Sequence, residues 1–134
     1  MAATAQHTAV SEAFQRHSEE TRIHVERLYK VFEMMRRAPR GKICPAIDGI
    51  IEENAEIIME DYEGTPAIDA GLIACAQAME HYEIARYRTL LGWAMELGMP
   101  EASKLLKATL TEEREIDAVL ARLAQNEVNW RALR

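Results

Sequence analysis

Residues 8–37 read TAVSEAFQRHSEETRIHVERLYKVFEMMRR, without a single glycine or proline. One set of positions in this stretch recurs at intervals of three and four residues, which is the spacing of side chains along one face of an α-helix. These positions are Phe14, His17, Thr21, His24, Leu28, Val31 and Met35. Half of this stripe is apolar and the other half is polar. The stretch therefore predicts a long helix whose inner face carries imidazoles as well as core side chains.

Outside this stretch, all four prolines and three of the six glycines fall in three groups. The groups are Pro39, Gly41 and Pro45, then Gly64 and Pro66, then Gly98 and Pro100. Because these residues break helices, they place breaks near 38–45, 62–66 and 98–100. The four segments between them, about 8–37, 46–61, 67–97 and 100–127, all have helical spacing. We therefore predict a single all-α domain over residues 1–134, a bundle of four antiparallel helices of which 46–61 is short.

Composition narrows the class of protein. The 134 residues carry a formal net charge of −6, which opposes nonspecific binding to nucleic acid or to anionic lipid, so we expect neither as a partner. The chain lacks the run of roughly 18 apolar residues that a membrane span needs, and we expect a cytoplasmic protein.

Cys44 and Cys75 are far apart and do not form a CxxC pair, so we expect buried free thiols. Arg36, Arg37, Arg40 and Lys42 are expected to form a solvated helix end.

Carboxylates occupy the apolar stripes of three predicted helices. Glu20 lies between His17 and His24 on one face of the first helix. Glu80 and Glu83 interrupt the stripe of the third helix, and Glu113 interrupts that of the fourth, with Asp117 one turn further on. The second helix carries Ile47, Ile50, Asn54 and Ile57 on its stripe and has no charge there.

Several carboxylates in one core repel one another, and each loses its hydration. A cation relieves both effects, and oxygen donors with one or two imidazoles suit iron or manganese, often as a pair of ions between bundle helices. The alternative is that some glutamates lie at the edge of a seam and reach water. For His24 we expect a hydrogen-bonded core residue rather than a ligand. Phosphate loops and nucleophile motifs are absent from the sequence.

Three stretches carry a family resemblance: HSEETRIHVERLYKVFE, IDAGLIACAQAMEHYEIARYRTLLGWAMELG and ASKLLKATLTEEREIDAVLARLAQNEVNWRA. They resemble the YciE/YciF-type ferritin-like family over nearly all of residues 8–132. The resemblance implies a ferritin-like helical bundle linked to bacterial stress responses, with a di-metal centre of iron or manganese. Carried over by motif, it implies a ligand set drawn from His17, Glu20, Glu80, Glu83, Glu113 and Asp117.

The sequence departs from the family at its start. Family members usually begin with a further helix bearing an A-E-K/R-Q-like stretch whose glutamate would supply one ligand, and this sequence does not contain it. Apolar seam surface would then need another cover, so we expect a homo-oligomer, a dimer or larger. The loss of that glutamate leaves three alternatives for the metal site: a partner subunit supplies a replacement, the site binds one ion weakly, or it binds none.

Two hypotheses follow. The first is a stress-response metal protein with iron or manganese between its helices and peroxide-linked or oxidase chemistry. The second is a helical oligomerisation or interaction module with a degenerate metal site. Metal content and metal-dependent stability separate them.

Overall fold

The structure, a computed structural model, describes residues 1–56 and 62–134, and every element in them is a helix. The helices are α1 (Thr8–Met34), α2 (Pro45–Glu56), α3 (Ile68–Glu96), α4 (Pro100–Leu123), η2 (Ala124–Val128) and α5 (Asn129–Ala132). This confirms the all-α prediction and the breaks near 38–45, 62–66 and 98–100. The last part of the predicted second helix, residues 57–61 with Ile57, lies outside the described residues.

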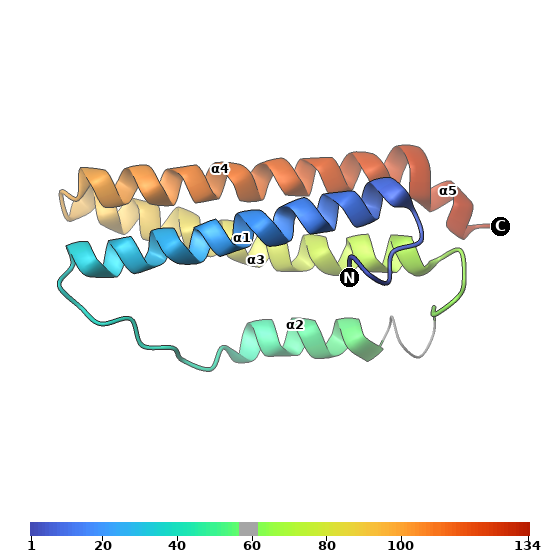
Figure 1. Cartoon of the computed structure of the whole chain (residues 1–134), viewed down its shortest axis with the longest axis horizontal. Coiled ribbons are helices and arrows are strands. Elements are labelled where there is room, and N and C mark those ends of the chain that lie inside the picture. The colour runs from blue at the N-terminus through green and yellow to red at the C-terminus, as the bar shows by residue number, and fades with distance from the viewer. Residues whose placement is uncertain (57–61) are drawn as a thin grey trace.

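Three long helices form the body of the molecule. Figure 1 shows α1 and α3 running in the same direction, with α4 antiparallel to both. α4 packs against α1 and against α3, and the short helix α2 packs against α3. A long connection, residues 35–44, carries the chain from the end of α1 to the start of α2 (Figure 1).

The apolar core falls into two clusters. The first joins the start of α1, the start of α3 and the end of α4; its largest fully buried members are Ile68, Leu72, Ile73 and Leu120. The second lies at the other end of the bundle and contains Tyr87, Ala94, Ala102, Leu106 and Leu110. The stripe of α4 runs through both clusters, and between them it carries the buried Glu113.

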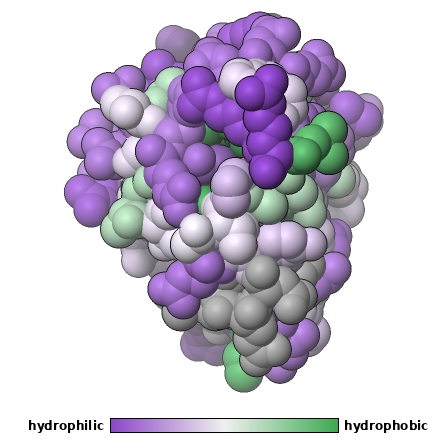
Figure 2. Space-filling view, turned by 90° about the vertical axis from the view of Figure 1, so that its right-hand side faces the viewer, coloured by the Kyte–Doolittle hydropathy of each residue, from purple (hydrophilic) through white to green (hydrophobic). Residues whose placement is uncertain are grey.

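The N-terminal lead, residues 1–7 before α1, closes the end of the first cluster. Asp69, in the first turn of α3, accepts hydrogen bonds from the backbone N–H groups of Gln6 and His7, each 2.9 Å long. Ala2 and Ala5 pack against the core beneath. Seen from this end, the described surface is mainly hydrophilic, with apolar residues only in scattered places (Figure 2).

The C-terminal end departs slightly from the prediction. The sequence predicts a helix to about residue 127, whereas regular α-helix ends at Leu123 and the wider turn η2 follows. This turn ends with Val128, which is buried in the first core cluster. The burial of Val128 therefore accompanies a change of helical pitch. The spacing of apolar residues in the sequence did not predict this change.

The prediction for the cysteines is half right. Both are free, and Cys75 is buried, but Cys44, which immediately precedes α2, is only half-buried. Its Sγ lies 3.1 Å from Tyr82 Oη. As to membranes, the described part of the chain has no helix with both the length and the apolar character that a bilayer span demands.

Two helix ends use the left-handed backbone conformation. At the end of α3, Gly98 has a φ of 65° and donates to Met95 O, while Met99 N donates to Ala94 O, a Schellman motif. At the end of α1, Arg36 takes the same role with a φ of 54°. A side chain at such a φ costs about 1–2 kcal/mol, which glycine avoids.

Replacing Arg36 by Gly should therefore stabilise the protein. The relief of strain exceeds the extra entropy of glycine in the unfolded chain, and we expect a gain of about 0.5–1 kcal/mol in the free energy of unfolding. Urea unfolding of chelator-treated protein measures it. Arg37→Gly, at the next position, is the control and should give no gain; equal effects of the two substitutions would contradict the assignment.

Candidate metal centre

A polar layer separates the two core clusters. α1 contributes His17 to it, α3 contributes Glu80 and Glu83, and α4 contributes Glu113. One ligand atom from each of the four residues can be chosen so that all four atoms lie within 4.8 Å of one another. Four of the six residues predicted from the sequence are therefore brought together in one place.

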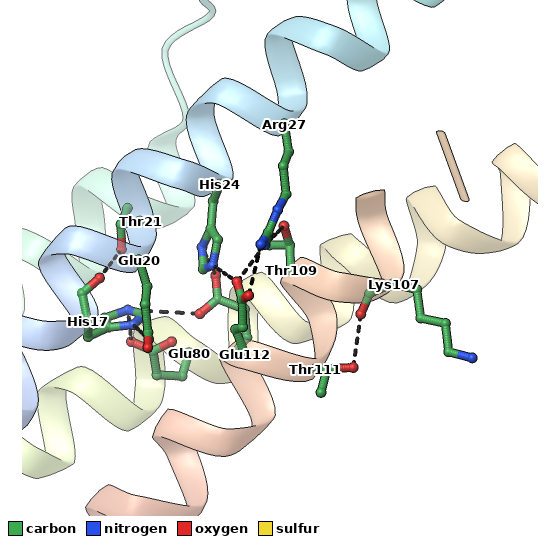
Figure 3. Close-up of polar contacts among 11 residues, drawn as sticks. His17, Glu20, Thr21, His24, Arg27, Glu80, Lys107, Thr109, Thr111 and Glu112 are labelled. Carbon is green, nitrogen blue, oxygen red and sulfur yellow. Dashed lines mark hydrogen bonds and ion pairs between the residues drawn. The ribbon is translucent and has the colours of Figure 1, made fainter. Parts of the chain in front are cut away.

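His17 contacts two of these carboxylates. Its Nε2 atom lies 3.1 Å from Glu80 Oε1 and 3.8 Å from Glu113 Oε2. Figure 3 shows the ring of His17 reaching from α1 towards Glu80 on α3. Glu80 is only 2% exposed and Glu113 only 1%, so both carboxyl groups are out of reach of bulk water.

Burial and repulsion make the acidic side chains hard to ionise. Burial raises the pKa of Glu83, and the negative charge of Glu113 raises it further. Burial likewise raises the pKa of Glu113; the nearby imidazole of His24, whose Nδ1 lies 3.1 Å from Glu113 Oε1, opposes this, and the contact with Glu80 adds to it. Without a cation, protons are therefore held in this layer more tightly than on a free glutamate.

The negative charges around His17 favour the protonated form of its imidazole. Burial by itself lowers the pKa of His17, but the hydrogen bond to Glu80 and the charges of Glu80, Glu113 and Glu83 outweigh it and raise the pKa. The same balance holds for His24: burial lowers its pKa, and the carboxylates of Glu113 and Glu112 raise it overall. The layer thus attracts positive charge, as protons or as a cation.

A second group of residues adjoins the cluster, and sequence reasoning missed most of it. His24 is 2% exposed, and its Nε2 lies 2.8 Å from Glu112 Oε2. Arg27 grips the same carboxylate with both terminal nitrogens, and its hydrogen bond lowers the pKa of Glu112. Two features of the sequence could have indicated this group: Glu112 adjoins the seam residue Glu113, and Arg27 follows His24 by one turn. His24 is hydrogen-bonded in the core, as expected.

Two predicted ligands lie elsewhere. Glu20 is a neighbour of the cluster, with its Oε2 3.8 Å from the other nitrogen of His17, Nδ1 (Figure 3). Asp117 accepts a hydrogen bond from Gln77 at 2.8 Å and lies 3.1 Å from His81 Nε2. The structure therefore places Asp117 in a surface network rather than with the four clustered residues.

The donor set fits a metal ion. Glu80 Oε2 and Glu113 Oε2 are buried, and neither has a hydrogen-bond partner among the residues described. Orphaned acceptors in a low-dielectric site are costly, and a cation in contact with carboxylate oxygens satisfies them. Three carboxylates with one imidazole are hard oxygen donors plus a nitrogen, a set suited to manganese or ferrous iron.

Comparison with known proteins agrees with this architecture. The model of the family described as a domain of unknown function, DUF892, matches residues 1–133. The chain belongs to this family. Protein YciF of Escherichia coli strain K12 is 46% identical over 124 residues, which are 92% of this chain and 74% of YciF.

Two solved structures of relatives have the same fold. The crystal structure of the E. coli stress protein YciF has a TM-score of 0.88 at 43% identity and covers 96% of this chain and 80% of its own. YcfI from Rhodopseudomonas palustris, described as a candidate structural protein, has a TM-score of 0.85 at 41% identity, covering 90% of this chain and 76% of its own. These matches confirm the YciF-type resemblance and the bundle fold.

The polar layer predicts an unusual pH dependence for the metal-free protein. Glu83, Glu113, His17 and His24 all have raised pKa values when folded. Each contributes stability that is complete below its unfolded pKa, near 4.5 for Glu and 6.5 for His, and that is lost as the pH rises through the folded value. The free energy of unfolding of chelator-treated protein should therefore fall as the pH rises above about 5.

Glu112, whose pKa is lowered, has the opposite sign, but its contribution is complete above its unfolded value of 4.5 and stays constant over this range. Urea unfolding at a series of pH values measures the trend. The variant Glu83→Gln should flatten it, because it removes one titrating group. Stability that rises with pH in the chelator-treated wild type would contradict the prediction.

Proposed function

We propose that the cluster of His17, Glu80, Glu83 and Glu113 is a site for a divalent cation, iron or manganese. The observation that carries this proposal is the burial of Glu80 and Glu113 beside each other, with an oxygen of each lacking a hydrogen-bond partner in the described chain. Burying like charges without compensation is unfavourable by several kcal/mol. The clustering of four donor atoms within 4.8 Å supports a shared ion as the compensation.

The residues have distinct roles in this proposal. Glu80 and Glu113, fully buried, would hold the ion, and Glu83 would reach it from the next turn of α3. His17 would supply an imidazole, with Glu20 beside its Nδ1 as the carboxylate that orients the ring. The two apolar clusters on either side would keep bulk water away.

The proposed role is protective redox chemistry in stress, either peroxide-linked or oxidase-like. A bound iron or manganese ion would supply the electron transfer to an oxidant, while the protein would fix the donor positions. Support for the stress context comes from the relative in E. coli, which is described as a stress protein.

Metal should raise the melting temperature, because it binds only the folded cluster. At a metal concentration about 100-fold above Kd, we expect a rise of roughly 10 °C for the wild type. Glu83→Gln and Glu113→Gln should blunt that rise, although both variants melt higher than wild type when metal-free, since each removes a repelling charge. Differential scanning calorimetry with Mn²⁺, or with Fe²⁺ under anaerobic conditions, measures both effects.

Glu52→Gln and Glu101→Gln are the matched controls, because both residues are exposed and lie outside the cluster. They should keep the full metal-induced rise. A wild-type melting temperature that neither metal changes would exclude the metal proposal for this chain.

A second observation favours self-association, with or without metal. At the end of the bundle opposite the N-terminal lead, an apolar groove opens between α1 and α3, lined by Phe32, Met35, Leu90, Trp93 and Leu97. Trp93 is 62% exposed and Leu97 68% exposed, which is high for side chains of this size. We propose that a second copy of the chain covers this groove. It is also the surface that an interaction module without metal chemistry would use.

The double substitution Trp93→Asp, Leu97→Asp should therefore weaken association. In analytical ultracentrifugation at micromolar concentration, the wild type should sediment as a dimer or larger and the variant as a 15.2 kDa monomer. Trp130→Asp is the control, since Trp130 is also exposed (46%) but lies in α5, outside the groove. A wild type that sediments as a monomer would disprove the self-association.

A further inference from the structure

Arg27 and Glu112 form a two-point ion pair between α1 and α4. Both terminal nitrogens of Arg27 reach the carboxylate; the Nη2 to Oε1 distance is 2.8 Å, and Nη1 pairs with Oε2. Nη1 also donates to the hydroxyl of the buried Thr109 at 3.1 Å. Paired bonds of this kind fix the orientation of both planar groups. The carboxylate of Glu112 is therefore held in one position (Figure 3).

When the imidazole of His24 is neutral, as it is when it binds a metal, that fixed carboxylate determines which of its two nitrogens carries the proton. Glu112 Oε2 lies 2.8 Å from His24 Nε2. A carboxylate paired with a guanidinium is ionised and can only accept hydrogen bonds, so Nε2 is the donor. The opposite nitrogen, Nδ1, then faces the interior of the polar layer.

On that side, Nδ1 meets the candidate metal centre. It lies 3.1 Å from Glu113 Oε1, yet it is buried and makes no well-aligned hydrogen bond within the described chain. Two donor atoms bound to one cation at about 2.1 Å each are separated by about 3 Å, so the distance suits two ligands of a common ion. Glu113 Oε2 faces the other histidine, His17, at 3.8 Å. Its two oxygens thus point towards two different imidazoles.

We propose that Arg27 and Glu112 are positioning residues for the cation site. They hold His24 with its proton on Nε2, so that Nδ1 is presented as a further donor on the Oε1 side of Glu113. This inference rests on the proposed metal function, and it adds His24 to the four clustered residues. The arrangement of carboxylate, histidine and metal is one that proteins use to orient imidazole ligands.

The experiment compares wild type with Glu112→Gln in the full chain, with Zn²⁺ as a diamagnetic probe. Zinc affinity is measured by calorimetric titration, and His24 is followed by long-range ¹H–¹⁵N spectra of protein with ¹⁵N-labelled histidine. In the wild type, Zn²⁺ should shift Nδ1 of His24 while Nε2 keeps its proton. In Glu112→Gln, the affinity should fall about 10–100-fold and the Nδ1 shift should be lost.

Two further variants make the result interpretable. Glu26→Gln removes the same charge from an exposed site next to Arg27 and should behave as wild type. The double variant Arg27→Gln, Glu112→Gln leaves no unpaired guanidinium and should still lose affinity, which covers the case in which Glu112→Gln alone fails to fold.

Each outcome has a separate meaning. If the wild type binds Zn²⁺ but Nδ1 of His24 does not shift, or if neither Glu112 variant weakens binding, the positioning inference is wrong and the metal centre stands. If the wild type binds neither Zn²⁺ nor Mn²⁺, the metal centre itself is wrong and the inference fails with it.

Discussion

The burial of carboxyl groups between two apolar clusters is the constraint on which the rest of this structure depends. Glu80 and Glu113 lie at the centre of a three-helix body where water is excluded. Such groups are tolerated only with positive partners, and each long helix is therefore tied to another through this layer. His17 joins α1 to α3, and Arg27 joins α1 to α4. A helix that shifted along its axis would leave a carboxylate unpaired, so the layer fixes the register of the bundle.

The two ends of the bundle differ in how well their apolar residues are covered. At one end, the N-terminal lead is held by Asp69, and Val128 fills the core from η2. At the other end, Trp93 and Leu97 remain exposed beside the groove. The polar layer lies between a closed cluster and an open one, so a second copy covering the groove, as proposed, would also help to keep water from the carboxylates on that side.

Helical spacing in the sequence was sufficient to predict the helices and to find Glu80, Glu83 and Glu113 on their inner faces. It was not sufficient to predict which residues pair between helices. Which residues of one helix meet those of another depends on their relative translation, which a single helix does not encode. The pair of Arg27 and Glu112 was missed because both side chains lie at the edge of a seam and read as surface charges. Asp117 was grouped with the site because it follows Glu113 by one turn, but that one turn carries it to Gln77 and His81.

The position of the layer has a mechanical consequence. α1 and α3 each pack against α4. Side chains of the polar layer, such as His17 and Glu80, bridge α1 and α3. An ion bound by donors from all three helices would close this triangle, because it replaces repulsion between α3 and α4 with attraction to a common centre and draws α1 in through its imidazole. Binding free energy gained there is folding free energy for the whole bundle. The same cluster that makes the metal-free protein costly to fold would then become the strongest contact between its helices.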